Sequence, residues 1–153
     1  MNEPYTIRVA TPADLGAIEA TLRGAELPLD GLRDQFGEGY AVAEADGQVI
    51  GVEGIEVHGD DGLLRSAAVS AAWRGRGVGD ALTRDRIEWA RRRGLRSLYL
   101  LTTTAGDYFP RFGFTHVERE VAPDAVRQSR EFSDACPSTA LFMALTLQRE
   151  PRS

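Results

Sequence analysis

The sequence predicts a mixed α/β domain, and three observations in the middle of the chain indicate it. An apolar run over residues 63–69 is typical of a strand buried on both faces. Residues 74–79 follow with glycines at alternate positions, where a tight backbone turn is easiest. A helix is then expected over residues 78–93, because three arginines in its last turn suit the negative end of the helix dipole and Gly94 can adopt the left-handed C-cap conformation.

Length and composition are those of one ordinary domain spanning residues 1–153. No apolar run approaches the roughly 20 residues needed to cross a bilayer. No basic-then-apolar signal opens the chain, so we expect a cytoplasmic protein that does not enter a membrane. The net charge of -5 argues against non-specific nucleic-acid binding. The single cysteine, Cys136, excludes an internal disulfide and a multi-cysteine metal cluster, and no metal is expected.

The N-terminal part of the chain predicts an edge strand followed by helices. Residues 5–10 alternate well enough for an edge strand. Thr11 is expected to cap the next helix, with Pro12 at its first position. A short second helix is expected over residues 32–36, in a region that covers the sheet or lines a binding pocket. The apolar stripe of the first helix consists of Leu15, Ile18 and Leu22.

A β-hairpin is expected next. Strands are predicted over residues 40–45 and 48–57, because Asp46-Gly47 between them is a strong hairpin-turn signal. The stretch over residues 58–62 is interpreted as another turn.

Two carboxylates on the second hairpin strand are candidates for acid–base chemistry. Glu53 and Glu56 are three residues apart, so they should point to opposite sides of the sheet, one toward solvent and one toward a covered side or a cleft. One interpretation is an ion pair with Arg65 on the next strand. The other is a general base, and Glu56, near the strand's end, is favoured for that role.

Neither histidine receives a catalytic role from the sequence. His58 lies in a predicted turn, where a lone histidine is more often exposed, although it could titrate near neutral pH. His116 lies in a predicted late strand and has no neighbours with metal-ligand spacing.

The helix over residues 78–93 should bury one side. Val78, Leu82 and Trp89 share that side, whereas Ile87 lies off the apolar stripe. Nine arginines lie between residues 65 and 96 against three acidic residues, and most of them suit a solvated helix face. Arginines near a polyanionic ligand would help to attract it.

The C-terminal half predicts three further strands. They are expected over residues 96–102, 114–118 and 139–147. A short helix over residues 105–112 should lie between the first two and end at Gly113.

The glycine turn predicts an anion site. A strand that leads through such a turn into a helix directs several free N–H groups at one point, and the helix dipole favours a phosphate there. A P-loop is excluded because the chain contains no lysine. The dinucleotide fingerprint is excluded because the glycines run G-x-G-x-G in mid-chain.

Arg74-x-x-Gly77-x-Gly79 resembles the (Gln/Arg)-x-x-Gly-x-(Gly/Ala) signature of the GNAT superfamily of acyl-CoA N-acyltransferases. The resemblance implies an α/β (α+β) fold with a mostly antiparallel sheet of about seven strands, flanked by helices and splayed around the acyl-CoA site. It also implies acetyl-CoA as co-substrate, with the pyrophosphate on the turn amides and the pantetheine arm along the preceding strand. The residues so assigned are Ala68, Val69, Arg74, Gly75, Arg76, Gly77, Val78, Gly79 and Asp80.

The segment over residues 105–114 resembles a second element of that superfamily, A-x-x-(F)-Y-x-K-x-G-F. Phe109 occupies the usual tyrosine position, so the hydroxyl that often protonates the departing thiolate is missing. Tyr108 is one residue off, which on a helix turns it about 100° away. Arg111 keeps the charge of the usual lysine. Thr102 falls where the superfamily often has an asparagine that bonds the pantetheine, and both Thr102 and Phe109 are assigned to the cofactor site.

The segments LLRSAAV, LYLLTTTA and EFSDACPSTA are similar to arsenic-resistance N-acetyltransferases and short amino-acid N-acetyltransferases. This similarity implies a small, amino-acid-like amine acceptor acetylated by direct attack. We expect Arg65 and Ser66 to hold the acceptor's carboxylate while Glu56 receives the amine proton. Two rival interpretations are a non-catalytic acetyl-CoA-binding or sensing domain and an acetyltransferase for protein N-termini or lysines. A homodimer is left open.

Overall fold

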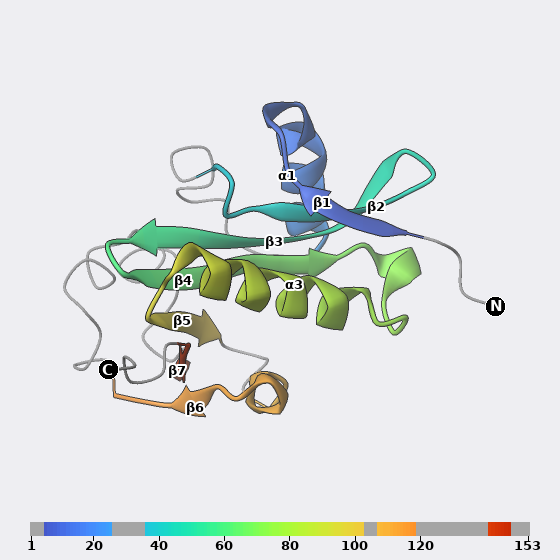
Figure 1. Cartoon of the computed structure of the whole chain (residues 1–153). Helices are drawn as coiled ribbons and strands as arrows, with labels where there is room; N and C mark the ends of the chain where they lie inside the picture. The colour runs from blue at the N-terminus through green and yellow to red at the C-terminus, as the bar shows by residue number, and fades with distance from the viewer. Residues whose placement is uncertain (1–4, 26–35, 103–106, 119–140, 148–153) are drawn as a thin grey trace.

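The computed structural model describes residues 5–25, 36–102, 107–118 and 141–147 and shows one sheet with helices on both faces (Figure 1). The sheet has seven strands in the order β1-β2-β3-β4-β5-β7-β6. Every neighbouring pair is antiparallel except β4 and β5. The predicted mixed, mostly antiparallel fold is therefore confirmed. The strands are β1 (Thr6–Val9), β2 (Ala41–Ala45), β3 (Gln48–His58), β4 (Asp61–Val69), β5 (Ser97–Thr102), β6 (Thr115–His116) and β7 (Leu141–Thr146).

Two α-helices cover opposite faces of β3. Helix α1 (Leu15–Gly24) follows a 3-10 turn, η1 (Pro12–Asp14), and packs against Val52 through its predicted apolar stripe. Helix α3 (Val78–Arg93) packs against Ile55. Because Val52 and Ile55 are an odd number of residues apart on one strand, their side chains point to opposite faces. None of the described helices has the length and apolar character needed to span a membrane.

Helix α3 has the predicted bounds but a wider buried side than expected. It starts after Gly77 (φ +85°) and ends before Gly94 (φ +89°), both in the left-handed region that favours glycine. The expectation that Ile87 lies off the buried stripe is wrong, because Ile87 is 6% exposed and packs in the main core. Trp89 is only half-buried. The helix lies flat across the sheet, so the face that it buries is broader than a single stripe.

Several local predictions are confirmed, and one predicted helix is shorter than expected. The hairpin turn has positive φ at both Asp46 (+53°) and Gly47 (+75°), as a two-residue hairpin loop requires. The expected short helix after β5 is a 3-10 turn, η3 (Phe109–Phe112), that ends at Gly113. The expected helix over residues 32–36 lies almost wholly outside the described residues, as does Cys136.

The sheet opens between β4 and β5, and this opening positions the site. The two strands pair only from Asp61–Ser97 to Leu63–Tyr99. Beyond that point β4 continues with β3 as far as Val69, and β5 continues with β7. The edge of β4 that faces β5 is therefore without a paired strand from residue 64 onward in the described part of the chain.

A bulge in β4 lies beside this opening. The register pairs Val52 with Ala68 and Gly54 with Arg65, so two residues on β4, Ser66 and Ala67, oppose one residue on β3. Ser66 has φ +60°, which is uncommon for a residue with a side chain. Bulges of this kind take backbone groups out of the strand ladder.

Candidate active site

The glycine turn presents free backbone donors to open space. Gly75 and Gly77 have φ of +78° and +85°, and a Cβ at either position would have no neighbour within 4 Å. The first helical hydrogen bond runs from Ala81 N to Gly77 O (3.0 Å). The N–H groups of Val78, Gly79 and Asp80 precede that bond, so they have no acceptor within the helix. This is the geometry of an anion site at a helix N-terminus.

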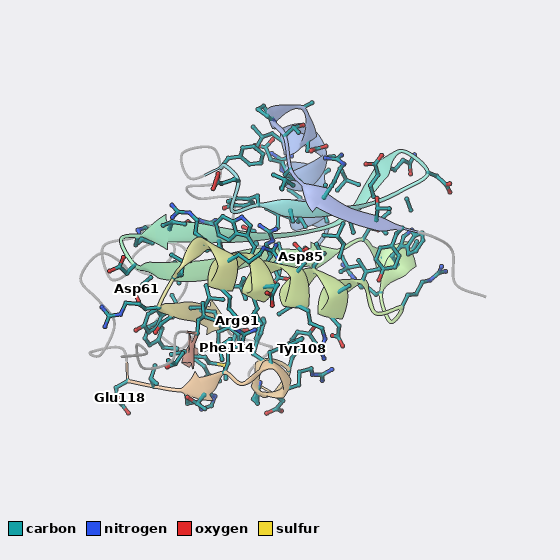
Figure 2. All side chains as sticks on the ribbon, in the orientation of Figure 1. Asp61, Asp85, Arg91, Tyr108, Phe114 and Glu118 are labelled. Carbon is teal, nitrogen blue, oxygen red and sulfur yellow. The ribbon has the colours of Figure 1, made fainter. Side chains whose placement is uncertain are left out.

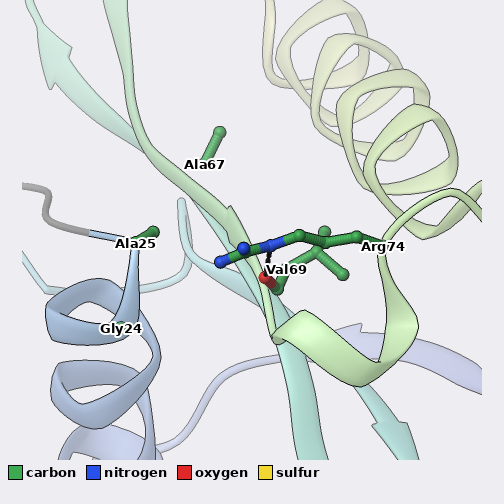
Figure 3. Close-up of a pocket in the computed structure, with 5 residues that line it drawn as sticks. All are labelled: Gly24, Ala25, Ala67, Val69 and Arg74. Atoms are coloured by element: carbon green, nitrogen blue, oxygen red, sulfur yellow. Dashed lines mark hydrogen bonds between the residues drawn. The ribbon is translucent and has the colours of Figure 1, made fainter.

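A pocket of about 490 Å³ lies between the end of α1, β4 and this turn (Figure 3). The Arg74 side chain extends across it, and Arg74 Nε donates to the carbonyl of Val69 (3.0 Å). Arg74 thereby fixes the end of β4 to the start of the turn. The pocket is lined by Gly24, Ala25, Ala67, Val69 and Arg74.

The other turn residues assigned to the cofactor occupy distinct surroundings. The Arg76 guanidinium lies over the Trp73 ring, 4.9 Å from its centre, and is exposed. Ala68 is buried on the α1 side of the sheet. Thr102 ends β5 opposite Leu141 of β7.

The two neighbouring aromatic residues after β5, Tyr108 and Phe109, lie in different surroundings. Phe109 is buried in the main core, whereas Tyr108 lies between η3 and α3 (Figure 2). The Tyr108 hydroxyl donates to Asp80 Oδ1 (2.5 Å), and the Arg111 guanidinium lies 4.4 Å from the ring centre. Burial and the Asp80 carboxylate raise the pKa of Tyr108, so its phenol stays protonated near neutral pH. Tyr108 therefore joins η3 to the first turn of α3, next to Gly79.

Both candidate carboxylates are buried, each on its own face. Their side chains point to opposite sides as predicted, but the expectation that one faces solvent is wrong, since each is 1% exposed. Glu53 faces α3, where the Thr83 hydroxyl lies 2.8 and 3.0 Å from its two oxygens. Burial raises the pKa of Glu53 to about 8. Glu53 therefore keeps a proton at neutral pH.

Glu56 lies on the face opposite α3 and forms the anticipated ion pair. Arg65 Nη1 donates to Glu56 Oε2, and His58 Nε2 lies 3.0 Å from Glu56 Oε1. Burial favours the neutral carboxyl, but the hydrogen bonds of His58 and Arg65 outweigh it and lower the pKa of Glu56. Glu56 is therefore a carboxylate at neutral pH.

His58 is the site residue that the sequence did not indicate. It belongs to β3 rather than to the predicted turn, and its side chain is 13% exposed. The signal that could have found it is its two-residue spacing from Glu56, which places both side chains on one face of a strand. Arg65 Nε also donates to Ser66 Oγ (3.1 Å). Hydrogen bonds therefore connect His58, through Glu56 and Arg65, to the bulge of β4. No cluster of three or more potential metal ligands occurs among the residues that the structure describes.

The chain was compared with known protein families. Residues 37–116 match the model of the acetyltransferase (GNAT) domain, which is more than half of the chain. The chain belongs to the GNAT acetyltransferase family. The matched range contains the opening, the bulge and the glycine turn of this GNAT domain.

A curated relative and two solved structures resemble this GNAT domain. An amino-acid acetyltransferase of Pasteurella multocida is 28% identical over 84% of the chain, and the chain spans 31% of that protein's length. N-acetylglutamate synthase from Neisseria gonorrhoeae, complexed with coenzyme A and N-acetyl-glutamate, shares the fold with a TM-score of 0.81 at 23% identity, over 97% of this chain and 36% of the other. Rv2747 from Mycobacterium tuberculosis, in complex with CoA and NLQ, has a TM-score of 0.77 at 26% identity, over 94% of this chain and 99% of the other.

Proposed function

We propose that this GNAT domain is an acetyl-CoA-dependent N-acetyltransferase that acts on the amine of a small, amino-acid-like acceptor. One observation carries the proposal: the free edge of β4 is followed by a glycine turn with open space around Gly75 and Gly77 and a helix N-terminus behind it. A long acyl donor with a polyanionic end fits this arrangement, because its amide-containing arm can pair with a strand edge while its phosphates meet a helix N-terminus.

The cofactor contacts divide between backbone and side chains. The pyrophosphate is assigned to the turn from Gly75 through Gly77 and to the first-turn amides of α3. Arg74 and Arg76 add positive charge at this end. The pantetheine arm is assigned to the backbone of Ala68 and Val69, with Thr102 and Phe109 on the opposite side of the opening. Asp80 contributes its backbone N–H, while its carboxylate is bound by Tyr108.

The bulge supplies the polar environment for the reacting carbonyl. Ser66 and Ala67 turn their backbone groups out of the β3–β4 ladder, and Ala67 lines the pocket. A backbone N–H aimed at a carbonyl oxygen stabilises the negative charge that develops there during acyl transfer. Acetyl-CoA supplies the acetyl group, and coenzyme A departs as a thiolate that takes a proton from water.

Acceptor recognition is assigned to the cluster beside the bulge. Arg65 binds Glu56 and Ser66, and the acceptor's carboxylate is assigned to its guanidinium, because a planar fork can bind a carboxylate through two parallel hydrogen bonds. The acceptor amine attacks the thioester carbon, a C–N bond forms as the C–S bond breaks, and the amine's proton is transferred to Glu56, directly or through water. An ionised Glu56 can take that proton, and a neutral Glu53 cannot.

The similarity to an amino-acid acetyltransferase supports this acceptor class. The test is a screen of acetyl-CoA consumption against free amino acids, phosphinothricin-like and arsenical amino acids, polyamines and peptides, with the products identified by mass spectrometry. We expect turnover with one or more free amino acids and none with polyamines. Turnover on peptides alone would indicate a protein acetyltransferase. Binding of acetyl-CoA without turnover on any amine would indicate a sensing domain.

A further inference from the structure

Four side chains form a hydrogen-bonded row on the face of the sheet opposite α3, and we name this row the His58 chain. His58 Nε2 lies 3.0 Å from Glu56 Oε1, and Glu56 Oε2 accepts a hydrogen bond from Arg65 Nη1. Arg65 Nε donates to Ser66 Oγ (3.1 Å). The His58 chain thus connects the end of β3 to the bulge of β4. Its members are His58, Glu56, Arg65 and Ser66.

Burial makes this row rigid. The side chains of Glu56 and Arg65 are each 1% exposed, and that of His58 is 13% exposed. Each oxygen of the Glu56 carboxylate is held by a different basic side chain, so the carboxylate cannot rotate without breaking a contact. The plane of the Arg65 guanidinium is then fixed by Glu56 on one side and by Ser66 on the other.

Other charged groups near His58 are few in the described part of the chain. On its own strand the neighbour is Glu56, and on β4 the register places Asp61 opposite His58. Burial raises the pKa of Asp61. The charge of Arg96 partly offsets this rise, and the Asp60 carboxylate adds to it. An Asp61→Asn variant therefore separates any contribution of this carboxylate from that of His58.

We propose that His58 is a positioning residue for acceptor recognition: it holds the Glu56 carboxylate, and through Glu56 it orients the Arg65 guanidinium toward the acceptor's carboxylate. The inference rests on the proposed function, because it requires an acceptor with a carboxylate. It adds a residue to that function.

The test is steady-state kinetics of wild type, His58→Leu and His58→Gln between pH 6 and 8. The acceptors are the free amino acids that wild type acetylates, each compared with its α-carboxamide. His58→Leu removes the contact to Glu56, and His58→Gln keeps a side-chain N–H donor that can replace it. The matched controls are His116→Gln, which changes the chain's other histidine at an exposed site, and Asp61→Asn. Melting temperatures check the folding of each variant.

In His58→Leu we expect the KM for amino acids to rise about tenfold while the KM for acetyl-CoA and for carboxamides changes little. In His58→Gln, which keeps a donor for Glu56, the KM for amino acids should stay within about threefold of the wild-type value at each pH.

Each contrary result would identify a different claim as wrong. If wild type acetylates amino acids and the His58 variants behave like His116→Gln at every pH, the acceptor class stands and the role of His58 is wrong. Equal rises in KM for amino acids, carboxamides and acetyl-CoA would also overturn it, since they indicate general damage to the site. If wild type acetylates no amino acid, the acceptor class fails as well, and the wild-type data alone show it.

Discussion

Two buried carboxyl groups of this domain, Glu53 and Glu56, have opposite protonation states. Glu53 is a neutral acid on the α3 side, with a pKa of about 8, because burial dominates its surroundings. Glu56, three residues further along the same strand, is a carboxylate because His58 and Arg65 bind it. Only Glu56 is therefore equipped to accept a proton and to hold a guanidinium at neutral pH.

Arg65→Lys should raise the KM for the acceptor about tenfold, about 1.4 kcal/mol, and change the KM for acetyl-CoA much less. A lysine keeps the charge but has no planar fork to hold Glu56, Ser66 and a carboxylate at once. Steady-state kinetics with both substrates measure this. Equal losses for the two substrates would instead indicate that Arg65 serves the fold through its ion pair.

Glu56→Gln should lower turnover chiefly at low pH, where spontaneous deprotonation of the amine is scarcest. The matched control is Glu53→Gln, which alters the neutral carboxyl on the other face and should leave the pH profile unchanged. A flat response of turnover to pH in Glu56→Gln, relative to wild type, would assign Glu56 to a structural ion pair only.

Phe109→Tyr should leave the turnover rate within about tenfold of wild type, about 1.4 kcal/mol in barrier. Phe109 is buried in the aromatic cluster, so a hydroxyl there would need a partner inside the core. Single-turnover rates with a known acceptor provide the measurement. A much larger gain in rate would mean that the natural protein is an impaired enzyme or a sensor.

Helix α3 and strand β4 act together, since the turn between them joins the free strand edge to the helix N-terminus. Arg74 strengthens this junction by binding the last carbonyl of β4, and Tyr108 binds the first turn of α3 from η3. Beneath α3, Glu53 and Thr83 join the helix to β3 opposite the bulge. These contacts hold the turn at a fixed distance from the bulge.

The burial of Glu53 beneath α3 predicts that the free energy of unfolding depends on pH. The pKa of Glu53 rises from 4.5 in the unfolded chain to about 8 in the fold, so the folded state binds the proton more tightly. Stability from this group is then fully present below pH 4.5 and is lost at about 1.4 kcal/mol per pH unit as the pH rises toward 8.

Urea unfolding of wild type and Glu53→Gln at pH 5, 6, 7 and 8 measures this effect. The difference in unfolding free energy between the two proteins should shift in favour of Glu53→Gln as the pH rises. The acidic contribution of Asp14, with a pKa of about 2, lies below this window. A difference that stays constant from pH 5 to 8 would show that Glu53 is ionised throughout.

Local features of α3 and the hairpin were predictable because short-range sequence signals specify them. Gly77, Gly94 and Asp46-Gly47 occur where the backbone needs positive φ, and all three positions were found from sequence. The bulge at Ser66 and the contact of His58 with Glu56 could not be predicted in this way, because they depend on how two strands pair and pack. The burial of Ile87 was missed because the width of a helix's buried face is set by the sheet beneath it.

At the scale of the whole molecule, the described part of the sheet divides between β4 and β5, and the two parts of the proposed site lie along β4. The helix N-terminus and the glycine turn lie at one end of β4, and the His58 chain extends from the bulge toward the other end. In the proposed function, the cofactor and the acceptor approach the bulge from different directions. This arrangement suits direct transfer between two bound substrates without a covalent enzyme intermediate.

The central claim is that coenzyme A binds with its pyrophosphate on the turn at Gly77, and calorimetric titration of acetyl-CoA tests it most directly. The variant is Gly77→Val, and the chain offers a matched control in Gly94→Val at the other end of the same helix. Both glycines have positive φ, +85° and +89°, and at both a Cβ would meet nothing within 4 Å, so the backbone strain is comparable. We predict that both variants lose similar stability, and that only Gly77→Val loses acetyl-CoA affinity, by about tenfold or more. Unchanged affinity in a folded Gly77→Val protein, or equal losses of affinity in the two variants, would contradict the account.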